Sequence, residues 1–182
     1  MLKYKTLFLM INVLGGISVL GGYAIGLTSA PENPSVLWGN VPENWRGGYG
    51  ISMIVAAIGY LGFFFYIMQD NKWSQSLTKN HTVLNTVIAL CALFLISASM
   101  WMPAALQFIK TGADSWWAIT VGSLWITSLT VIGIFVVLMV QQNGTQIKMR
   151  LFAIFGLGYL GFHCLVLDAI IWTLNFPTGL YT

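Results

Sequence analysis

Five apolar runs, each long enough to cross a bilayer, constrain this chain more than any other feature. They cover residues 6–27, 48–68, 83–106, 116–140 and 151–174. A hydrocarbon core of about 30 Å needs roughly 20 apolar residues in a helix. Because backbone groups in lipid must be hydrogen-bonded within the protein, runs of this length predict helices. We therefore expect an all-α integral membrane protein, with residues 1–182 forming a single domain of five transmembrane helices.

The low charge content points to a surface covered by lipid. Asp, Glu, Lys and Arg make up 7% of the chain, against about 25% in an ordinary soluble domain. So few charged side chains cannot cover a surface that faces water, and the lipid bilayer is therefore the first predicted partner. The net charge of +3 is too small and too scattered along the chain to suggest nucleic acid, so we expect no nucleic acid partner.

The distribution of Lys and Arg predicts the orientation of the bundle, because cytoplasmic loops carry an excess of these residues. Six of the eight lie at one end of the predicted bundle and two at the other. The six are Lys3, Lys5, Lys72, Lys79, Lys148 and Arg150, and the two are Arg46 and Lys110. This asymmetry predicts that the N-terminus lies inside and the C-terminus outside, in a multi-pass protein of the cell inner membrane.

The last run, residues 151–174, contains two ionisable side chains, His163 and Asp168. An acidic group at the centre of a membrane helix costs about 2.5–3.5 kcal/mol, so such a group is expected to face protein and to have a partner or a function. At about 100° per residue in an α-helix, the two side chains lie about 140° apart. We therefore expect no His163–Asp168 pair, and each would need a partner from another helix, such as Tyr23, Ser97, Ser99 or Trp101. A structural role and a functional role stay open for both residues.

Neither catalysis nor a metal centre is predicted. No nucleophile and base can be placed beside Asp168 or His163 from the sequence, so we expect the protein not to be an enzyme. Cys91 and Cys164 fall in apolar runs and behave there as small buried hydrophobic residues. The thioethers of the two methionines beside Trp101 make only a weak copper alternative, because no third ligand can be named.

The longest predicted connection, residues 28–47, reads TSAPENPSVLWGNVPENWRG. Long ordered loops are often functional, and its two tryptophans favour a loop that covers the mouth of a cavity. A cap lying in the membrane interface is the alternative. Six of the eight tryptophans fall at or near the predicted outer face, more than an aromatic belt at both interfaces explains. The predicted pocket therefore lies in the outer half of the bundle, and its candidate residues are Trp38, Trp45, Trp101, Pro103, Trp125, His163, Asp168 and Trp172.

Glycine and other small residues form stripes on the first two predicted helices. Gly15, Gly22 and Gly26 share one face of the first helix, and a G-x-x-x-G pair allows close approach of a second helix. Ser52, Ala56, Gly59 and Gly62 repeat the pattern on the second helix. We expect these two helices to pack tightly together; a homodimer or a larger membrane complex held through the same faces is the alternative.

The architecture resembles the tryptophan-rich sensory protein, or translocator protein, family (TspO). The features in common are five spanning helices in a short chain, the richness in Trp, a long first loop with Pro and Trp, and Trp101-x-Pro103 in the third run. The resemblance implies a small α-bundle that binds tetrapyrroles and sterol-like or drug-like ligands beneath the first loop. By position, it implies that Trp38 and Trp45 lie in that covering loop and that Trp101 and Pro103 belong to the helix 3 motif.

The chain also departs from the pattern of that family. Pro42 stands alone where the family has paired prolines, Ala98 replaces an asparagine, and Met102 replaces a serine or threonine. The similarity therefore consists of the general architecture and a few residues.

Together these features predict a non-enzymatic membrane protein that binds an apolar or aromatic ligand, tetrapyrrole-like or sterol-like, under the first loop. A tetrapyrrole is the cofactor that the resemblance suggests. The alternative is a structural or assembly subunit of a larger membrane protein complex, in which the glycine faces and outer tryptophans would be contacts between helices.

Overall fold

The computed structural model of the chain describes residues 2–29, 34–69, 81–141 and 146–180. Lys72 and Lys79, two of the positive charges that predict the orientation, lie outside these ranges, as do residues 30–33 of the predicted covering loop. Everything said below concerns the described residues.

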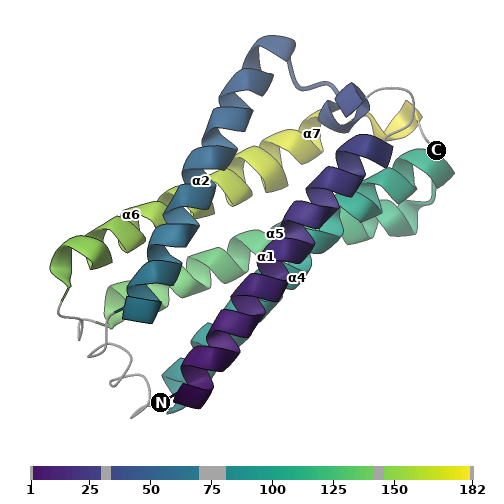
Figure 1. Cartoon of the computed structure of the whole chain (residues 1–182). Coiled ribbons are helices and arrows are strands. Elements are labelled where there is room, and N and C mark those ends of the chain that lie inside the picture. The colour runs from purple at the N-terminus through teal and green to yellow at the C-terminus, as the bar shows by residue number, and fades with distance from the viewer. Residues whose placement is uncertain (1, 30–33, 70–80, 142–145, 181–182) are drawn as a thin grey trace.

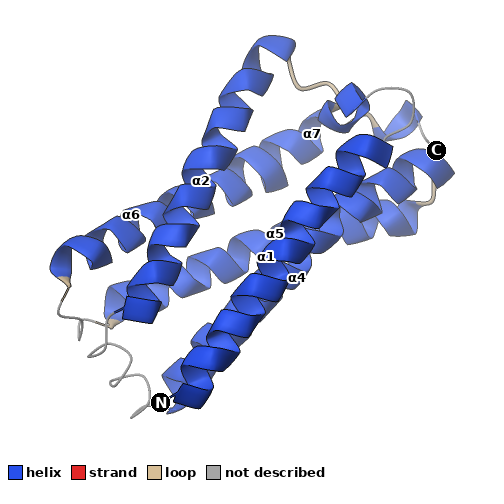
Figure 2. Cartoon of the chain, viewed as in Figure 1, coloured by secondary structure: helices blue, strands red, loops and turns tan. Residues whose placement is uncertain are grey.

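Five helices are long and apolar enough to span a membrane (Figure 1). The first four are α1 (Leu2–Ser29), α2 (Glu43–Gln69), α4 (His81–Thr111) and α5 (Asp114–Val140), and the fifth is made of α6 (Ile147–Phe162), η2 (His163–Trp172) and α7 (Thr173–Asn175). The short 3-10 helices η1 (Pro34–Trp38) and η3 (Thr178–Leu180) lie outside the spans. Over the described part of the chain there are helices and loops but no strands (Figure 2). The prediction of an all-helical chain with five long apolar helices is confirmed.

All five spanning helices extend beyond the predicted limits, and α2 and α4 each do so by five residues at one end. α2 begins at Glu43 rather than near residue 48, because Pro42 precedes it and an acidic residue in the first turn stabilises a helix N-terminus. Trp45 therefore belongs to the first turn of α2 and not to the covering loop. α4 continues past Pro103 to Thr111, since membrane helices tolerate an internal proline when neighbouring groups satisfy the freed carbonyl.

The helices form a chain of neighbours. α1 packs on α4, α4 on α5, α5 on α6 and η2, and α6 on α2. Figure 1 shows α1 running beside α4, with α2 and α6 side by side in another part of the bundle. The main core lies between α2, α4, α5 and α6, where Phe63, Cys91, Val131 and Leu157 are fully buried.

The prediction that the first two helices pack along their glycine faces is wrong. The glycine face of α1 meets α4, since a Cβ added at Gly15 would lie 2.7 Å from the Cβ of Leu95. The closest backbone contact of α2 is with α6, where a Cβ at Gly59 would lie 2.6 Å from the carbonyl oxygen of Gly156. Small residues allow close approach to any helix, and the sequence of one helix does not specify which neighbour fills the space.

α1 and α2 contact each other directly at the end of the bundle opposite η1. The Lys5 ammonium donates a hydrogen bond to the carbonyl of Met68 over 2.9 Å. The Tyr60 hydroxyl donates to Asn12 Oδ1 over 2.5 Å, and the rings of Phe8 and Phe64 stack with centroids 5.8 Å apart. Toward the η1 end, α1 packs on α4 while α2 packs on α6 and η2. This arrangement leaves a space between α1 and α2.

Candidate functional site

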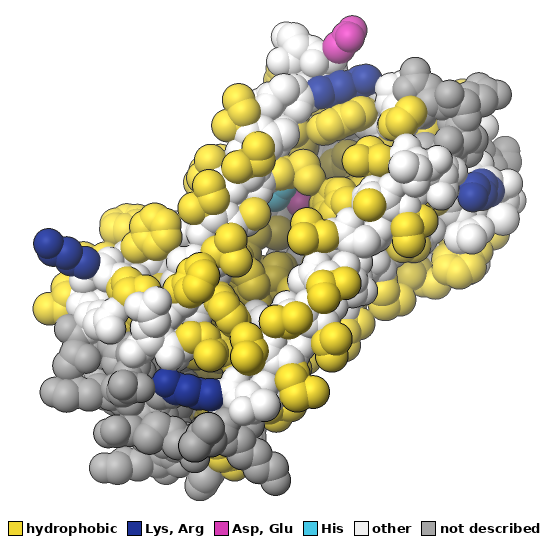
Figure 3. All heavy atoms as spheres, in the orientation of Figure 1, with side chains coloured by type: hydrophobic (Ala, Val, Ile, Leu, Met, Phe, Trp, Pro, Cys, Tyr) yellow, Lys and Arg dark blue, Asp and Glu magenta, His cyan; other side chains and the backbone are white. Residues whose placement is uncertain are grey.

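A hollow opens between α1 and α2 on one face of the molecule. Figure 3 shows that hydrophobic side chains line it and that a histidine and an acidic side chain are visible at its floor. His163 and Asp168 are the polar pair at this level of the bundle. Their side chains are 6% and 30% exposed, so the histidine is buried while the carboxylate is accessible.

His163 and Asp168 contact each other, contrary to the expectation from α-helical geometry. Nε2 of His163 lies 3.5 Å from Oδ2 of Asp168. The reason is local, because residues His163–Trp172 form a π-helix rather than an α-helix. Hydrogen bonds from residue i to i+5 widen each turn and bring side chains five positions apart over one another. The sequence-based prediction of separate faces is therefore wrong, since it assumed α-helical periodicity throughout.

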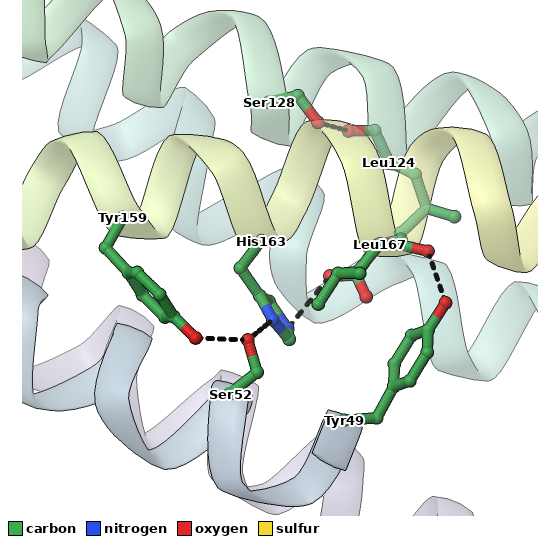
Figure 4. Close-up of polar contacts among 8 residues, drawn as sticks. Tyr49, Ser52, Leu124, Ser128, Tyr159, His163 and Leu167 are labelled. Atoms are coloured by element: carbon green, nitrogen blue, oxygen red, sulfur yellow. Dashed lines mark hydrogen bonds and ion pairs between the residues drawn. The ribbon is translucent and has the colours of Figure 1, made fainter. Parts of the chain in front are cut away.

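Ser52 on α2 connects this pair to a tyrosine. The Ser52 hydroxyl lies 2.8 Å from Nδ1 of His163 and 2.9 Å from the hydroxyl of Tyr159 on α6. Figure 4 shows Tyr159, Ser52 and His163 in a row between the two helices. All groups are satisfied when Tyr159 donates to Ser52, Ser52 donates to Nδ1, and the Nε2–H of His163 points to Asp168. These contacts fix the His163 ring and direct its N–H to the carboxylate.

A second hydroxyl anchors α2 to the π-helix. The Tyr49 hydroxyl donates to the carbonyl of Leu167 over 3.1 Å (Figure 4). Tyr49 is buried, and Trp38 packs edge-on against its ring with centroids 5.8 Å apart. The Tyr49 phenol therefore lies beside the backbone of Leu167, the residue that precedes Asp168.

An aromatic cluster fills the η1 end of the bundle. Trp172 lies at its centre, with ring centroids 5.6 Å from Trp101, 5.9 Å from Trp117 and 4.8 Å from Phe176. Trp101 in turn contacts Tyr23 with centroids 5.8 Å apart. Edge-to-face and tilted pairs at these distances are favourable arrangements for aromatic rings. The cluster joins α1, α4, α5 and the last helix around one end of the hollow.

The first loop is fastened to this cluster. The indole Nε1–H of Trp172 donates to the carbonyl of Leu37 in η1 over 2.8 Å, and the backbone N–H of Asn40 donates to the carbonyl of Asn175 over 2.9 Å. Gly39 has a φ of +55°, a left-handed conformation that glycine adopts at little cost. Arg46 donates through Nε to the carbonyl of Val41 and lies 5.9 Å over the Trp38 ring. The described part of the loop is thus an ordered cover over the last helix.

The structure brings together five of the eight predicted site residues. His163 and Asp168 form the polar pair, Trp101 and Trp172 belong to the aromatic cluster, and Trp38 lies in η1 against Tyr49. The other three are apart from them: Trp45 is 51% exposed on α2, Trp125 is 41% exposed on α5, and Pro103 faces outward from α4.

Ser52, Tyr159 and Tyr49, which bond around the polar pair, were not among the predicted site residues. In the sequence Ser52 belongs to a small-residue stripe on the second helix, and its place opposite His163 follows only from the packing of α2 on α6. The two tyrosines stand in apolar runs where a phenol is common, so their positions in the sequence carried no distinguishing signal.

The methionines of the weak copper alternative lie on different sides of α4. Met102 is buried against α1, near Gly26, while Met100 is exposed. Among the described residues, no group of three or more His, Cys, Asp or Glu side chains gathers in a geometry that could hold a metal ion.

Comparison with known proteins identified no relative of this chain. No protein-family model, no curated protein and no solved structure matches this chain.

Proposed function

We propose that this chain is a membrane protein that binds an apolar or aromatic ligand in the hollow between α1 and α2, at the end covered by the first loop. The observation that carries the proposal is the accessible Asp168 carboxylate at the floor of an otherwise hydrophobic hollow (Figure 3). Ligand sites are concave and mostly apolar, with a few polar groups that orient the ligand. A polar pair held at membrane depth is a functional candidate for the same reason.

The walls of the hollow suit a flat or aromatic molecule. Tyr23 and Trp101 stand at its η1 end as contacting rings, and aromatic side chains bind such ligands through burial and stacking. The resemblance to the tryptophan-rich sensory protein family points to a tetrapyrrole or a sterol as the first ligands to test. That family relationship stays a prediction.

We also propose that the η1 end faces the outside of the cell inner membrane. Arg46 and Lys110 are the Lys and Arg residues at this end, whereas Lys3, Lys5, Lys148 and Arg150 lie at the other. Single cysteines at Asn40 and at Lys148 would test the orientation with a thiol reagent that does not cross membranes. We expect labelling at residue 40 in intact cells and at residue 148 only after lysis; the reverse pattern would contradict the proposed orientation.

The experiment that tests binding is a tryptophan-fluorescence titration of the purified protein in detergent with a porphyrin and with a sterol. Trp101→Ala removes one ring from the end of the hollow. Trp125→Ala is a matched control, because this tryptophan is exposed and has no ring partner among the described residues. We expect saturable quenching at micromolar porphyrin, or a saturable change with the sterol, weakened about ten-fold by Trp101→Ala and unchanged by Trp125→Ala, since an aromatic contact contributes ~1 kcal/mol or more.

The absence of saturation in a folded wild-type sample would overturn the ligand-binding proposal. If both alanine variants weaken ligand binding equally, the binding site lies outside the hollow.

A role as a structural or assembly subunit is the second candidate, and open glycine positions favour it. A Cβ added at Gly16, Gly21, Gly47, Gly48 or Gly50 would meet nothing within 4 Å, so these surfaces of α1 and α2 can accept a further helix. Gly47→Leu would then block assembly, which sedimentation or light scattering in detergent would detect as a smaller particle. If wild type and variant are both monomeric in detergent and purify from mild membrane extracts without other chains, this candidate fails.

A further inference from the structure

Asp168 is a carboxylate at membrane depth that accepts fewer hydrogen bonds than its two oxygens allow. Among the described residues, its close polar contact is the one with Nε2 of His163, at 3.5 Å. A carboxylate accepts through two oxygens with about four lone-pair directions. Because 30% of the side chain is exposed toward the hollow, the remaining positions are open to a molecule that occupies it.

Within the described part of the chain, no cationic side chain complements this carboxylate. Among the described residues, no Lys or Arg lies within ion-pair distance of Asp168. Arg46, the guanidinium on the neighbouring α2, is held by the Val41 carbonyl and the Trp38 ring. His163 is fixed by Ser52 on its other nitrogen. A ligand with a positive charge can therefore supply the partner that Asp168 lacks among the described Lys and Arg residues.

The surroundings of Asp168 suit a cation better than an anion. The Tyr49 hydroxyl of α2 donates to the carbonyl of Leu167, the residue before Asp168, and Tyr23 of α1 packs against Trp101 near Leu37 of η1. The faces of aromatic rings attract ammonium groups, most strongly when water is excluded. An anionic head group would instead meet the Asp168 charge in a low-dielectric setting, where repulsion is strong.

We infer that the hollow binds a lipid-soluble amine, whose ammonium group pairs with Asp168 while its apolar body lies between α1 and α2. This inference rests on the proposed function and names its ligand class. The amine enters sideways from the bilayer, because the two helices that flank the hollow carry exposed apolar side chains such as Ile17, Ile51 and Ile54. His163 is a positioning residue, which keeps the carboxylate turned to the hollow.

The test compares two probes that differ only in their head group, aminomethylanthracene and hydroxymethylanthracene. Energy transfer from tryptophan to anthracene reports binding to the full-length protein in a neutral detergent. The amine should bind wild type at least about ten-fold more tightly than the alcohol, because hydrogen bonds to charged groups are the strong ones. Asp168→Asn should abolish that preference and leave the affinity for the alcohol unchanged. Asp114→Asn, which removes an exposed carboxylate at the start of α5, should change neither affinity.

Unchanged binding of the alcohol also shows that Asp168→Asn keeps the hollow intact. If that variant fails to fold, wild type alone provides the second measurement. Dicyclohexylcarbodiimide, which modifies carboxyl groups in apolar surroundings, should label Asp168 more slowly when the hollow is saturated with the amine than when it is saturated with the alcohol, as followed by mass spectrometry of the peptide.

The possible results separate the two proposals. Equal affinity of wild type for both probes, or equal protection of Asp168 by both, would overturn the amine inference and leave the proposed binding of apolar ligands in place. Binding of neither these probes nor a porphyrin or sterol would overturn the proposed function, and the amine inference with it.

Discussion

Nε2 of His163 lies 3.5 Å from Oδ2 of Asp168 although the two residues are five positions apart along one helix. The contact exists because the chain between them is a π-helix, His163–Trp172. Such segments are rare in proteins and are frequent at functional sites. The same segment provides Leu167, whose carbonyl accepts from Tyr49, and Trp172, whose indole holds the first loop. One irregular stretch of backbone therefore positions the polar floor of the hollow and its aromatic end.

Replacing Ser52 by alanine should destabilise the protein through the loss of two contacts. Both Nδ1 of His163 and the Tyr159 hydroxyl lose their partner. Because His163 is buried, its unpartnered nitrogen costs about 1–3 kcal/mol. Thermal unfolding in detergent measures the effect. The matched control is Ser99→Ala, because the Ser99 hydroxyl bonds only the carbonyl of Ile96 in its own helix. Equal melting temperatures for the two variants would contradict a supporting role of Ser52.

Trp172→Phe should loosen the first loop while keeping an aromatic ring in the cluster. The substitution removes the Nε1–H that the Leu37 carbonyl accepts, at a cost of about 1–2 kcal/mol. Hydrogen exchange of residues 34–40 should speed up, whereas exchange in α5 should stay the same. Trp116→Phe serves as the control, because Trp116 is exposed at the start of α5. Unchanged exchange in the loop of Trp172→Phe would show that other contacts hold it.

Gly59→Ala and Gly21→Ala should have opposite effects on stability. A Cβ at Gly59 would lie 2.6 Å from the carbonyl oxygen of Gly156, so α2 and α6 must separate, at a cost of about 1–3 kcal/mol or more. A Cβ at Gly21 meets nothing within 4 Å, and alanine is favoured over glycine inside a helix by about 1 kcal/mol. Thermal unfolding of both variants checks the prediction. A stable Gly59→Ala would mean that the two backbones do not touch.

The hydrogen bond between Tyr60 and Asn12 should contribute to the joining of α1 and α2. Its coupling energy is expected to be about 1 kcal/mol, and a double-mutant cycle of Tyr60→Phe and Asn12→Ala measures it. The cycle separates this bond from the second contact of Asn12, which donates to the carbonyl of Phe8 over 2.7 Å. Additive effects of the two substitutions would show that the bond contributes nothing.

Part of this architecture could be predicted from the sequence, because it depends on properties that each segment has by itself. Length and hydropathy determined the five helices, since a run of about 20 apolar residues in lipid has few conformations that satisfy its backbone. The special status of Asp168 followed in the same way, from the cost of an acid in an apolar helix. The gathering of Trp101 and Trp172 at one end followed from their places near the ends of their runs.

Only the tertiary structure decided which helix faces which. The small-residue stripe on α1 packs against α4, and the one on α2 packs against α6. Small residues permit close packing without selecting a partner helix. That choice left α1 and α2 apart at the η1 end and placed Ser52 against His163. The π-helix likewise brought His163 next to Asp168. The α-helical periodicity of the sequence could not predict this contact, because a local widening of the helix depends on its neighbours and not on the order of apolar residues.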